Sequence, residues 1–302
     1  MARVALRHRD NVPGEWFVDE RCIDCGTCRE VAPQLFASVG DQSVVARQPV
    51  PRPPDCADDP AAGLDVSDET AAWLAAQACP TQSIGTVDHR PRPGRFYPRE
   101  VRDRSGVFDC GYCSEDSFGA TSWFITRPGG NILVDSPRYT AALAEPFATM
   151  GGIDHVVLTH RDDVADAARW AEEFGSRVWI HDDDAGAAPF ATDRFGGLDE
   201  VTITPELLTI PVPGHTRGSS VFLLDGHDLF TGDSLAWSIE QSDLTAFRYA
   251  CWYSWPTQAD SLERLASRHR FASVLPGHGA RTEGDPDDLH RRLVDLVARM
   301  RR

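Results

Sequence analysis

Four cysteines in the first third of the chain place the strongest constraint on how its N-terminal part can fold. Cys22, Cys25 and Cys28 are separated by two residues each, and Cys79 lies far downstream, directly before Pro80. Thiolates in a C-x2-C-x2-C run with a remote Cys-Pro are typical ligands of an iron–sulfur cluster. Because such clusters carry electrons, this spacing predicts an electron-donor protein as a partner, in addition to a substrate.

The residues after the cysteine triplet indicate one cluster rather than two. In two-cluster bacterial ferredoxins the run continues to a fourth cysteine before a proline, and that cysteine serves the other cluster. Here the run reaches Ala32-Pro33, so the proline is present and the cysteine is absent. The segment resembles a single-cluster bacterial ferredoxin, which implies a [4Fe-4S] cluster on the four cysteines. A four-thiolate zinc site is the alternative, and the Cys-Pro pattern disfavours it.

Composition excludes several classes of partner. The formal net charge is −16, from 30 Lys plus Arg against 46 Asp plus Glu, whereas nucleic acids and anionic membranes require a basic surface. Residues 1–13 are polar, and no run approaches the roughly 20 apolar residues of a membrane helix. Eight cysteines without a signal sequence fit metal binding in a reducing compartment, so we expect a cytoplasmic protein.

The 302 residues are enough for a small domain and a large one. Residues 1–90 are expected to form the small domain, the basic and proline-rich residues 91–104 a linker, and residues 105–302 the large domain. In the small domain we expect strands over residues 16–19, 43–47 and 83–87, and a helix capped by Ser67 that ends at 78. In the large domain we expect strands over residues 122–126, 132–135, 155–159, 177–180, 220–224, 229–230 and 273–275, and helices over 164–174, 256–268 and 287–302.

Potential metal ligands follow four predicted strands of the large domain. They lie in Thr159-His160, Pro213-Gly214-His215-Thr216, Thr231-Gly232-Asp233 and Pro276-Gly277-His278-Gly279. Loops at strand ends can aim such side chains from a rigid scaffold. A single histidine at a strand end is more often a hydrogen-bonded loop residue, but four such elements in this order predict a metal centre.

These elements resemble those of the metallo-β-lactamase superfamily, and the whole chain is similar to ferredoxin–metallo-β-lactamase fusions. The resemblance covers residues 105–302. It implies an α+β fold in which a small ferredoxin-like domain precedes an αββα sandwich. It also implies that His215, Asp233 and His278 are metal ligands, and that His160 is the first ligand of the family's T-H-x-H-x-D-H motif.

The first motif departs from the family pattern. Asp162, or Asp163, takes the place of its second histidine, and the later Asp-His pair is displaced to Asp166 without its histidine. We expect Asp162, Asp166 and His278 to complete a dinuclear, oxygen-rich site, which suits iron or manganese better than zinc. The alternative role for Asp162 or Asp163 is to cap the helix that follows.

The family ligands that this sequence keeps include His160, His215 and Asp233. Two histidines and one carboxylate leave open positions on a metal ion, as in non-haem Fe(II) sites. This set resembles the ligand set of persulfide dioxygenases. The preferred hypothesis is therefore an enzyme that performs iron-dependent redox chemistry on a small molecule, with the cluster supplying single electrons. The alternative is a metallo-hydrolase of esters, thioesters or lactams with a structural or regulatory cluster. Asp166 and Asp233 are the expected catalytic residues, Asp166 by orienting or deprotonating water.

Other candidate residues have weaker patterns. For the Cys110-x2-Cys113 pair we prefer two reduced thiols around a turn to a redox-active pair, because no thioredoxin-like pattern flanks it. Cys56 follows a proline-rich stretch and is expected to be a free thiol, with cluster ligation as the alternative. The aromatic run 251–256 is expected in the core, with lining of the substrate pocket as the alternative, and His181, His227 and His290 are expected at the surface.

Overall fold

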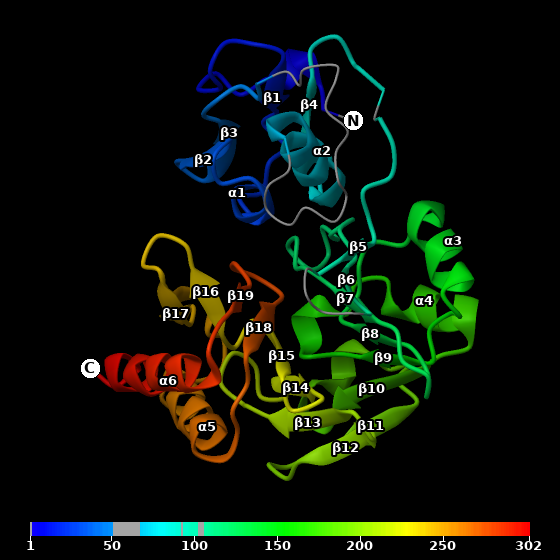
Figure 1. Cartoon of the computed structure of the whole chain (residues 1–302), viewed down its shortest axis with the longest axis vertical. Helices are drawn as coiled ribbons and strands as arrows, with labels where there is room; N and C mark the ends of the chain where they lie inside the picture. Colours follow the sequence, from blue (N-terminus) through cyan, green and yellow to red (C-terminus); the bar gives the residue numbers. More distant parts are fainter. Residues whose placement is uncertain (1, 51–66, 92, 102–105) are drawn as a thin grey trace. The chain divides into compact units, whose positions relative to one another are not determined.

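The computed structural model describes residues 2–50, 67–91, 93–101 and 106–302 (Figure 1). The chain divides into two compact units: unit 1 comprises Met1–Thr126 and Pro137–Gly151, and unit 2 comprises Arg127–Ser136 and Gly152–Arg302. Cys56 and part of the expected linker lie outside the described residues. In the described part of the chain, no helix is both long enough and apolar enough to cross a membrane.

The N-terminal part of unit 1 contains two small antiparallel sheets and two α-helices. The elements are η1 (Val4–Leu6), β1 (Trp16–Val18), α1 (Thr27–Val31), β2 (Phe36–Val39), β3 (Gln42–Val45), α2 (Asp68–Ala78) and β4 (Ile84–Thr86). Strand β1 pairs with β4, and β2 pairs with β3. The predicted strands and helix of this part are present, each within two residues of the expected bounds.

Helix α2 is the central element of this part of unit 1. Ser67 caps it by accepting a hydrogen bond from the Thr70 backbone N–H, and acidic residues in its first turn favour the positive end of the helix dipole. The residues from Ala71 to Ala78 are all buried, because five alanines allow close packing on every side of the helix. Trp73 packs edge to face on Trp16, with 4.7 Å between ring centroids. The helix therefore delivers Cys79 from a rigid support.

The rest of unit 1 contributes three antiparallel strands and one helix. The elements are β5 (Arg99–Glu100), β6 (Val107–Asp109), β7 (Trp123–Ile125) and α3 (Ala141–Thr149), with β6 between β5 and β7. Phe124 of β7 stacks on Phe147 of α3, with 4.3 Å between ring centroids. Only β7 was predicted, because β5 is two residues long and α3 contains Pro146, which masks the helical pattern.

Unit 2 contains four parallel strands, followed in the chain by a mostly antiparallel sheet. The parallel strands lie in the order β11-β10-β9-β8. The elements of this part are β8 (Ile132–Val134), β9 (His155–Val157), η2 (Arg161–Asp163), α4 (Ala167–Phe174), β10 (Arg177–His181), η3 (Asp182–Ala187) and β11 (Asp193–Phe195). All three residues of β8 are buried, and so are Val156 and Val157 of β9. Continuous burial of this kind is typical of parallel strands covered on both faces.

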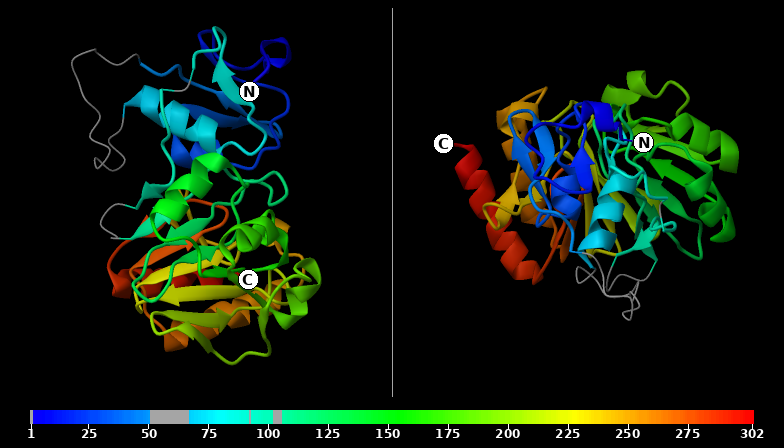
Figure 2. Two further views of the ribbon diagram at one scale, coloured as in Figure 1. Left: turned by 90° about the vertical axis from the view of Figure 1, so that its right-hand side faces the viewer. Right: turned by 90° about the horizontal axis from the view of Figure 1, so that it is seen from above.

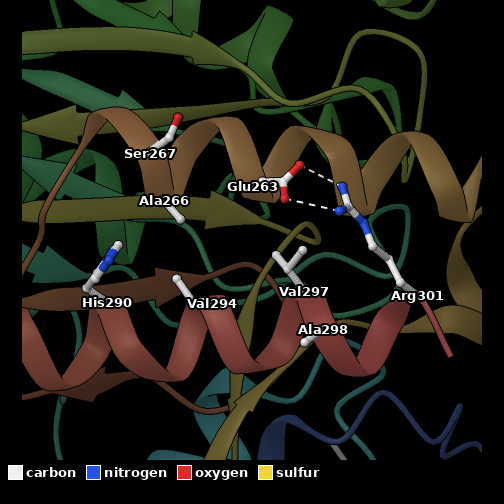
Figure 3. Close-up of a pocket in the computed structure, with 8 residues that line it drawn as sticks. All are labelled: Glu263, Ala266, Ser267, His290, Val294, Val297, Ala298 and Arg301. Carbon is white, nitrogen blue, oxygen red and sulfur yellow. Dashed lines mark hydrogen bonds and ion pairs between the residues drawn. The ribbon is translucent and has the colours of Figure 1, made fainter.

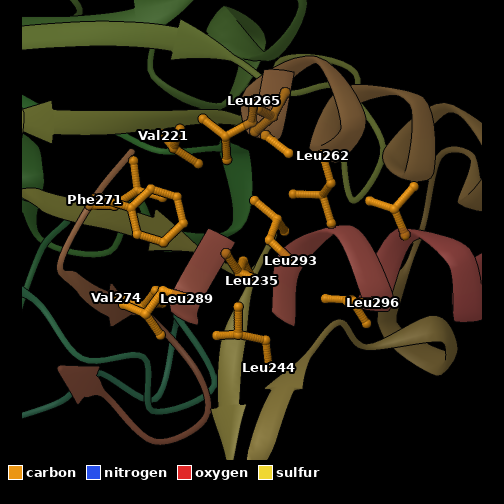
Figure 4. Close-up of a cluster of buried hydrophobic side chains, with 14 of the residues drawn as sticks. Val221, Leu235, Leu244, Leu262, Leu265, Phe271, Val274, Leu289, Leu293 and Leu296 are labelled. Atoms are coloured by element: carbon orange, nitrogen blue, oxygen red, sulfur yellow. The ribbon is translucent and has the colours of Figure 1, made fainter. Parts of the chain in front are cut away.

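The second sheet of unit 2 has the strand order β12-β13-β14-β15-β18-β19. Its strands are β12 (Val201–Thr204), β13 (Leu207–Pro211), β14 (Ser220–Leu224), β15 (Asp228–Gly232), β18 (Ser273–Pro276) and β19 (Thr282–Glu283). Between β15 and β18 the chain forms a separate hairpin, β16 (Ala236–Ser238) and β17 (Asp243–Thr245), and the turn η4 (Arg248–Ala250). Helices α5 (Trp255–Arg268) and α6 (Pro286–Met300) pack on one of its faces (Figures 1 and 2). Leucines from both helices, including Leu262 and Leu293, form a core with Val221 and Val274 (Figure 4).

The ends of the strands explain where the candidate ligands lie. Strands β15 and β18 are parallel neighbours, so Asp233 and His278, which follow them, lie at the same edge of the sheet. Gly232 has a φ of +48°, and a Cβ there would lie 2.4 Å from Thr159 Oγ1. Glycine is therefore required at this position, because the end of β15 approaches the residue beside His160 too closely for any side chain.

Candidate metal centres

His160, His215 and Asp233 form a compact group in unit 2. Each offers one ligand atom, and these atoms lie within 4.8 Å of one another. Asp233 Oδ2 is 3.8 Å from His160 Nε2 and 3.7 Å from His215 Nε2. The two histidines are 1% and 2% exposed, and both Nε2 atoms lack a hydrogen-bond partner. An unpartnered buried nitrogen is costly, so this donor set fits a metal ion that takes up both lone pairs.

His160 is held in a defined orientation by a hydrogen-bonded chain. Its Nδ1 lies 2.9 Å from Thr159 Oγ1, which in turn lies 2.9 Å from Asp135 Oδ2. Burial lowers the pKa of His160 to about 4, so the imidazole is neutral at neutral pH. When Asp135 is ionised it only accepts, so the Thr159 hydroxyl donates to it and accepts Nδ1–H of His160. The lone pair is then on Nε2, as a metal ligand requires.

Asp162 lies beside the same three ligands. Its Oδ2 is 3.4 Å from His215 Nε2 and 3.9 Å from His160 Nε2. The His215 imidazole beside it is the main cause of the lowered pKa of this carboxyl. The structure thus places Asp162 as a possible fourth ligand on the exposed side of the group.

The capping alternative for Asp162 and Asp163 is wrong. We expected the helix to start at Val164, but it begins at Ala167, and residues 161–163 form the short turn η2 instead. Asp166 stands at the N-cap position of this helix, without a side-chain capping bond. Asp166 does not belong to the group formed by His160, His215 and Asp233. Its expected roles as a metal ligand and as a general base stay predictions.

His278 contacts the other oxygen of Asp233, and Asp163 is buried close enough to feel the charge of Asp233. His278 Nδ1 lies 2.8 Å from Asp233 Oδ1, and Asp163 is 1% exposed with no hydrogen-bond partner on either oxygen. Burial, and then the charge of Asp233, raise the pKa of Asp163 well above its usual range. A Cβ on Gly277 would lie 2.9 Å from Asp163 Oδ2 and 3.1 Å from Asp233 Oδ1. Among the described residues these three do not form a second group within the 4.8 Å that joins His160, His215 and Asp233, so a second cation here stays a prediction.

Asp184 fixes the two histidine loops, and our sequence analysis missed it. This 2% exposed carboxylate accepts hydrogen bonds from the Arg161 backbone N–H at 3.1 Å, from Thr216 Oγ1 at 2.5 Å and from the Gly218 backbone N–H at 3.2 Å. It therefore ties the residue after His160 to the residue after His215. The available signal was a run of three aspartates directly after the strand over 177–180.

The segment after residue 250 also supports His215, and its expected place in the core is wrong for two residues. The backbone N–H groups of Trp252 and Tyr253 donate to the His215 carbonyl oxygen at 2.9 and 3.0 Å. Their side chains are 67% and 45% exposed. The Trp252 ring lies beside the His215 imidazole, with 6.3 Å between centroids, so both the backbone and this ring attach the segment to the metal-ligand loop.

The expectation that His181 lies at the surface is wrong. His181 is buried, and its Nδ1 accepts a hydrogen bond from the Asp183 N–H. A groove between α5 and α6 is lined by apolar residues and closed by the ion pair of Glu263 and Arg301 (Figure 3). It contains His290 but none of the candidate ligands, so it is separate from the metal group.

The four predicted cluster cysteines lie together in unit 1 and line one cavity. Cys22, Cys25 and Cys28 come from the loop into α1 and its first turn, and Cys79 follows α2. Among the described residues, no three of these sulfurs lie within 4.8 Å of one another. A single zinc ion, with Zn–S bonds of about 2.3 Å, would draw the sulfurs to about 3.8 Å apart. The wider spacing fits a multi-atom cluster.

Hydrogen bonds to sulfur and burial prepare the cysteines for ligation. The backbone N–H groups of Ser43 and Ser83 donate to Cys22 Sγ and Cys79 Sγ, each at 3.3 Å. Burial raises the pKa of Cys25 to about 11, so its thiolate needs positive charge close by. Cluster iron supplies such charge, and hydrogen bonds of this type tune its reduction potential.

Residues 110–119 pack against the cluster cysteines within unit 1. Cys110 and Cys113 are buried free thiols, and the Cys113 backbone N–H donates to the Ala78 carbonyl oxygen at 3.1 Å. Thr27 Oγ1 donates to the Gly119 carbonyl oxygen at 3.0 Å. Gly119 has a φ of +90°, and a Cβ there would lie 2.8 Å from Cys25 Sγ. A residue without a side chain is therefore needed over this ligand.

Comparison with known proteins identifies both domains. Residues 18–86 match the 4Fe-4S single cluster domain of Ferredoxin I, and residues 110–299 match the metallo-beta-lactamase superfamily. The chain is 28% identical over 163 residues to a hydroxyacylglutathione hydrolase of Xanthomonas campestris pv. campestris (strain B100), covering 51% of this chain and 58% of that protein. It is 25% identical over 162 residues to the uncharacterized protein YmaE of Bacillus subtilis (strain 168), covering 51% and 59%. The chain thus spans less than two thirds of the length of these relatives.

A solved structure supports the fold alone. The crystal structure of VMB-1 matches with a TM-score of 0.52 at 14% identity, covering 67% of this chain and 96% of that one. The predicted α+β fold, a small ferredoxin-like domain followed by a metallo-β-lactamase sandwich, is confirmed. The chain belongs to the metallo-β-lactamase superfamily and carries a single-cluster ferredoxin domain ahead of its metal-binding domain.

Proposed function

We propose that this protein is an oxidoreductase in which His160, His215 and Asp233 hold iron and the [4Fe-4S] cluster supplies it with single electrons for reaction with a small molecule. The observation that carries the proposal is the pair of buried, unpartnered Nε2 atoms facing one carboxylate oxygen. Two imidazoles and one carboxylate leave open positions for substrate, which is the arrangement of non-haem Fe(II) sites.

The surrounding carboxylates support iron over zinc. Asp162 takes the place of an imidazole that a two-zinc site of this family would use, and Asp163 contributes a further buried carboxylate. Oxygen-rich surroundings suit iron or manganese better than zinc, which prefers nitrogen and sulfur ligands. When bound, iron would supply a redox-active centre to which the substrate coordinates. Asp184 and Asp135 would keep the histidine ligands in place.

A hydrolase is the second candidate, and the similarity to a hydroxyacylglutathione hydrolase favours it. In that case a metal ion would lower the pKa of bound water toward about 7 and polarise a thioester carbonyl. Asp162, whose carboxyl is half exposed beside the ligands, would be placed to accept the proton from that water. The cluster would then have a structural or regulatory role.

Metal-exchanged protein separates the two candidates. Full-length protein would be purified anaerobically, loaded with Fe(II) or Zn(II), reduced with dithionite and freed of excess reductant. On mixing with limiting O2, cluster reoxidation followed by absorbance should be faster in the iron form than in the zinc form. Hydrolysis of a hydroxyacylglutathione thioester by the zinc form, at a rate independent of the cluster's oxidation state, would instead support the hydrolase.

A further inference from the structure

We propose that Arg138 is a positioning residue that couples the cluster electronically to the metal ligands; this inference rests on the proposed redox function. It completes a route of covalent bonds and hydrogen bonds from Cys79 to His160. The hydrogen bond from Arg138 lies within unit 1, and those from Asp135 through Thr159 to His160 lie within unit 2. The covalent backbone from Asp135 to Arg138 joins these two parts of the route.

The route begins at the residue after a cluster ligand. Arg138 Nη1 donates to the carbonyl oxygen of Pro80 at 3.0 Å, and Pro80 is bonded directly to Cys79. The Arg138 backbone N–H donates to the Tyr112 carbonyl oxygen at 2.9 Å, which fixes the other end of the residue. Arginines are usually paired with carboxylates. Among the described residues, however, the guanidinium of Arg138 makes no such ion pair and is directed to this carbonyl.

The route ends at a metal ligand. Asp135 lies three residues before Arg138 in the chain and is 2% exposed. Its carboxylate accepts from Thr159 Oγ1 at 2.9 Å, and that hydroxyl lies 2.9 Å from His160 Nδ1. Every link is therefore a covalent bond or a hydrogen bond of 3.0 Å or less, from the cluster cysteine to the imidazole.

Electronic coupling decays less through covalent and hydrogen bonds than across van der Waals gaps, so an unbroken route of such bonds provides a path for transfer. In the step itself, one electron leaves the reduced cluster, which is oxidised by one electron. Ferric iron at His160, His215 and Asp233 is reduced to ferrous iron. No covalent bond forms or breaks, and no proton is required.

The test measures electron transfer within the full-length, iron-loaded protein. Flash photoreduction of the cluster with a deazaflavin is followed by absorbance, and the loss of the ferric signal by EPR. Arg138→Gln removes the guanidinium donor and should slow cluster-to-iron transfer by about an order of magnitude. Arg138→Lys, which keeps a donor, should recover part of the rate. Arg95→Gln removes an exposed arginine of unit 1 that pairs with Glu145 and should leave the rate unchanged.

Further measurements separate coupling from folding. Cluster content, cluster midpoint potential and melting temperature should be the same in Arg138→Gln and the unmodified protein. Thr159→Val breaks the route at its other end, so it should slow transfer as well, and the double variant should be less than additive because both lie in series. Unchanged transfer in Arg138→Gln and Thr159→Val would overturn the inference. Absence of transfer in the unmodified protein would overturn the proposed redox function itself.

Discussion

The two metal-binding regions of this protein are specified by the chain in different ways. The proposed cluster site takes three of its four cysteines from seven consecutive residues, 22–28, and backbone N–H groups from nearby strands and turns donate to two of the four sulfurs. The proposed metal centre of unit 2 gathers His160, His215 and Asp233 from loops that lie far apart in the sequence. Its supporting groups, such as Asp184, are themselves distant in sequence. A local motif is therefore visible in a sequence, whereas a site assembled by a sheet depends on the whole domain.

The largest expected effect is the loss of metal from one of the two sites while the other keeps its cluster. His215→Ala removes one of two imidazole ligands and the loop residue to which Trp252 and Tyr253 are attached. We expect loss of the metal of unit 2 and full retention of the cluster, measured by elemental analysis and by the absorbance of the cluster. His290→Ala, in the groove between α5 and α6, should change neither. Loss of the cluster in His215→Ala would contradict the independence of the two sites.

The cluster site should be most sensitive at a residue outside its sequence motif. Gly119→Ala places a methyl group 2.8 Å from Cys25 Sγ in a backbone conformation unfavourable for alanine, so we expect most of the cluster to be lost after anaerobic reconstitution. Gly40→Ala is the matched control, because Gly40 has a φ of +63° with open space around it. It should cost only about 1 kcal/mol in unfolding free energy and keep the cluster. Equal cluster contents in the two variants would refute the close contact.

Support by a distant residue can be tested at Asp184. Asp184→Asn turns an acceptor of three hydrogen bonds into a group that must also present two N–H donors. We expect the free energy of unfolding to fall by about 1–3 kcal/mol and the metal affinity of unit 2 to fall roughly 10–100-fold. Chemical denaturation and competitive chelator titration measure these two quantities. Asp183→Asn, whose side chain is 57% exposed, should have no effect on either.

The smallest expected effect is on the stability of the cluster domain, through the buried carboxylate of Asp19. Asp19 is 0% exposed and accepts from the Arg3 N–H at 2.8 Å and from Arg21 Nη2 at 2.7 Å. Burial alone would raise its pKa, but these donors lower it below the usual 3.8. A lowered folded-state pKa gives stability that is present above the unfolded pKa and is lost as pH falls through the folded one.

Asp19→Asn should therefore reduce the unfolding free energy by about 1–2 kcal/mol at pH 7, and by progressively less as pH falls below about 4. Denaturation of the reconstituted protein at several pH values measures this dependence. Asp10→Asn, at a carboxyl whose side chain is 44% exposed, is the control and should leave stability unchanged. A destabilisation by Asp19→Asn that does not vary with pH would show that charge at this position is irrelevant.

Features that depend on neighbouring residues could be predicted from the sequence. Features that depend on residues far apart in the sequence could be predicted only in part. The Cys22, Cys25, Cys28 spacing and the Ser67 cap depend on neighbouring residues, so they could be recognised directly. The start of α4 was misplaced because Val164 and Ala165 continue a helical pattern that the structure breaks in order to present Asp162 and Asp163. Asp184 and Gly119 could not be assigned roles, because their partners are brought near only by the folded sheets.

The central claim is that one chain holds a cluster and a separate iron that exchange electrons. The most direct measurement is anaerobic purification with iron, zinc and acid-labile sulfide quantified, followed by EPR during stepwise reduction. The account predicts iron in excess of sulfide, and a ferric signal from unit 2 that disappears when the cluster is reduced. Iron equal to sulfide, with stoichiometric zinc and no further iron signal, would contradict it.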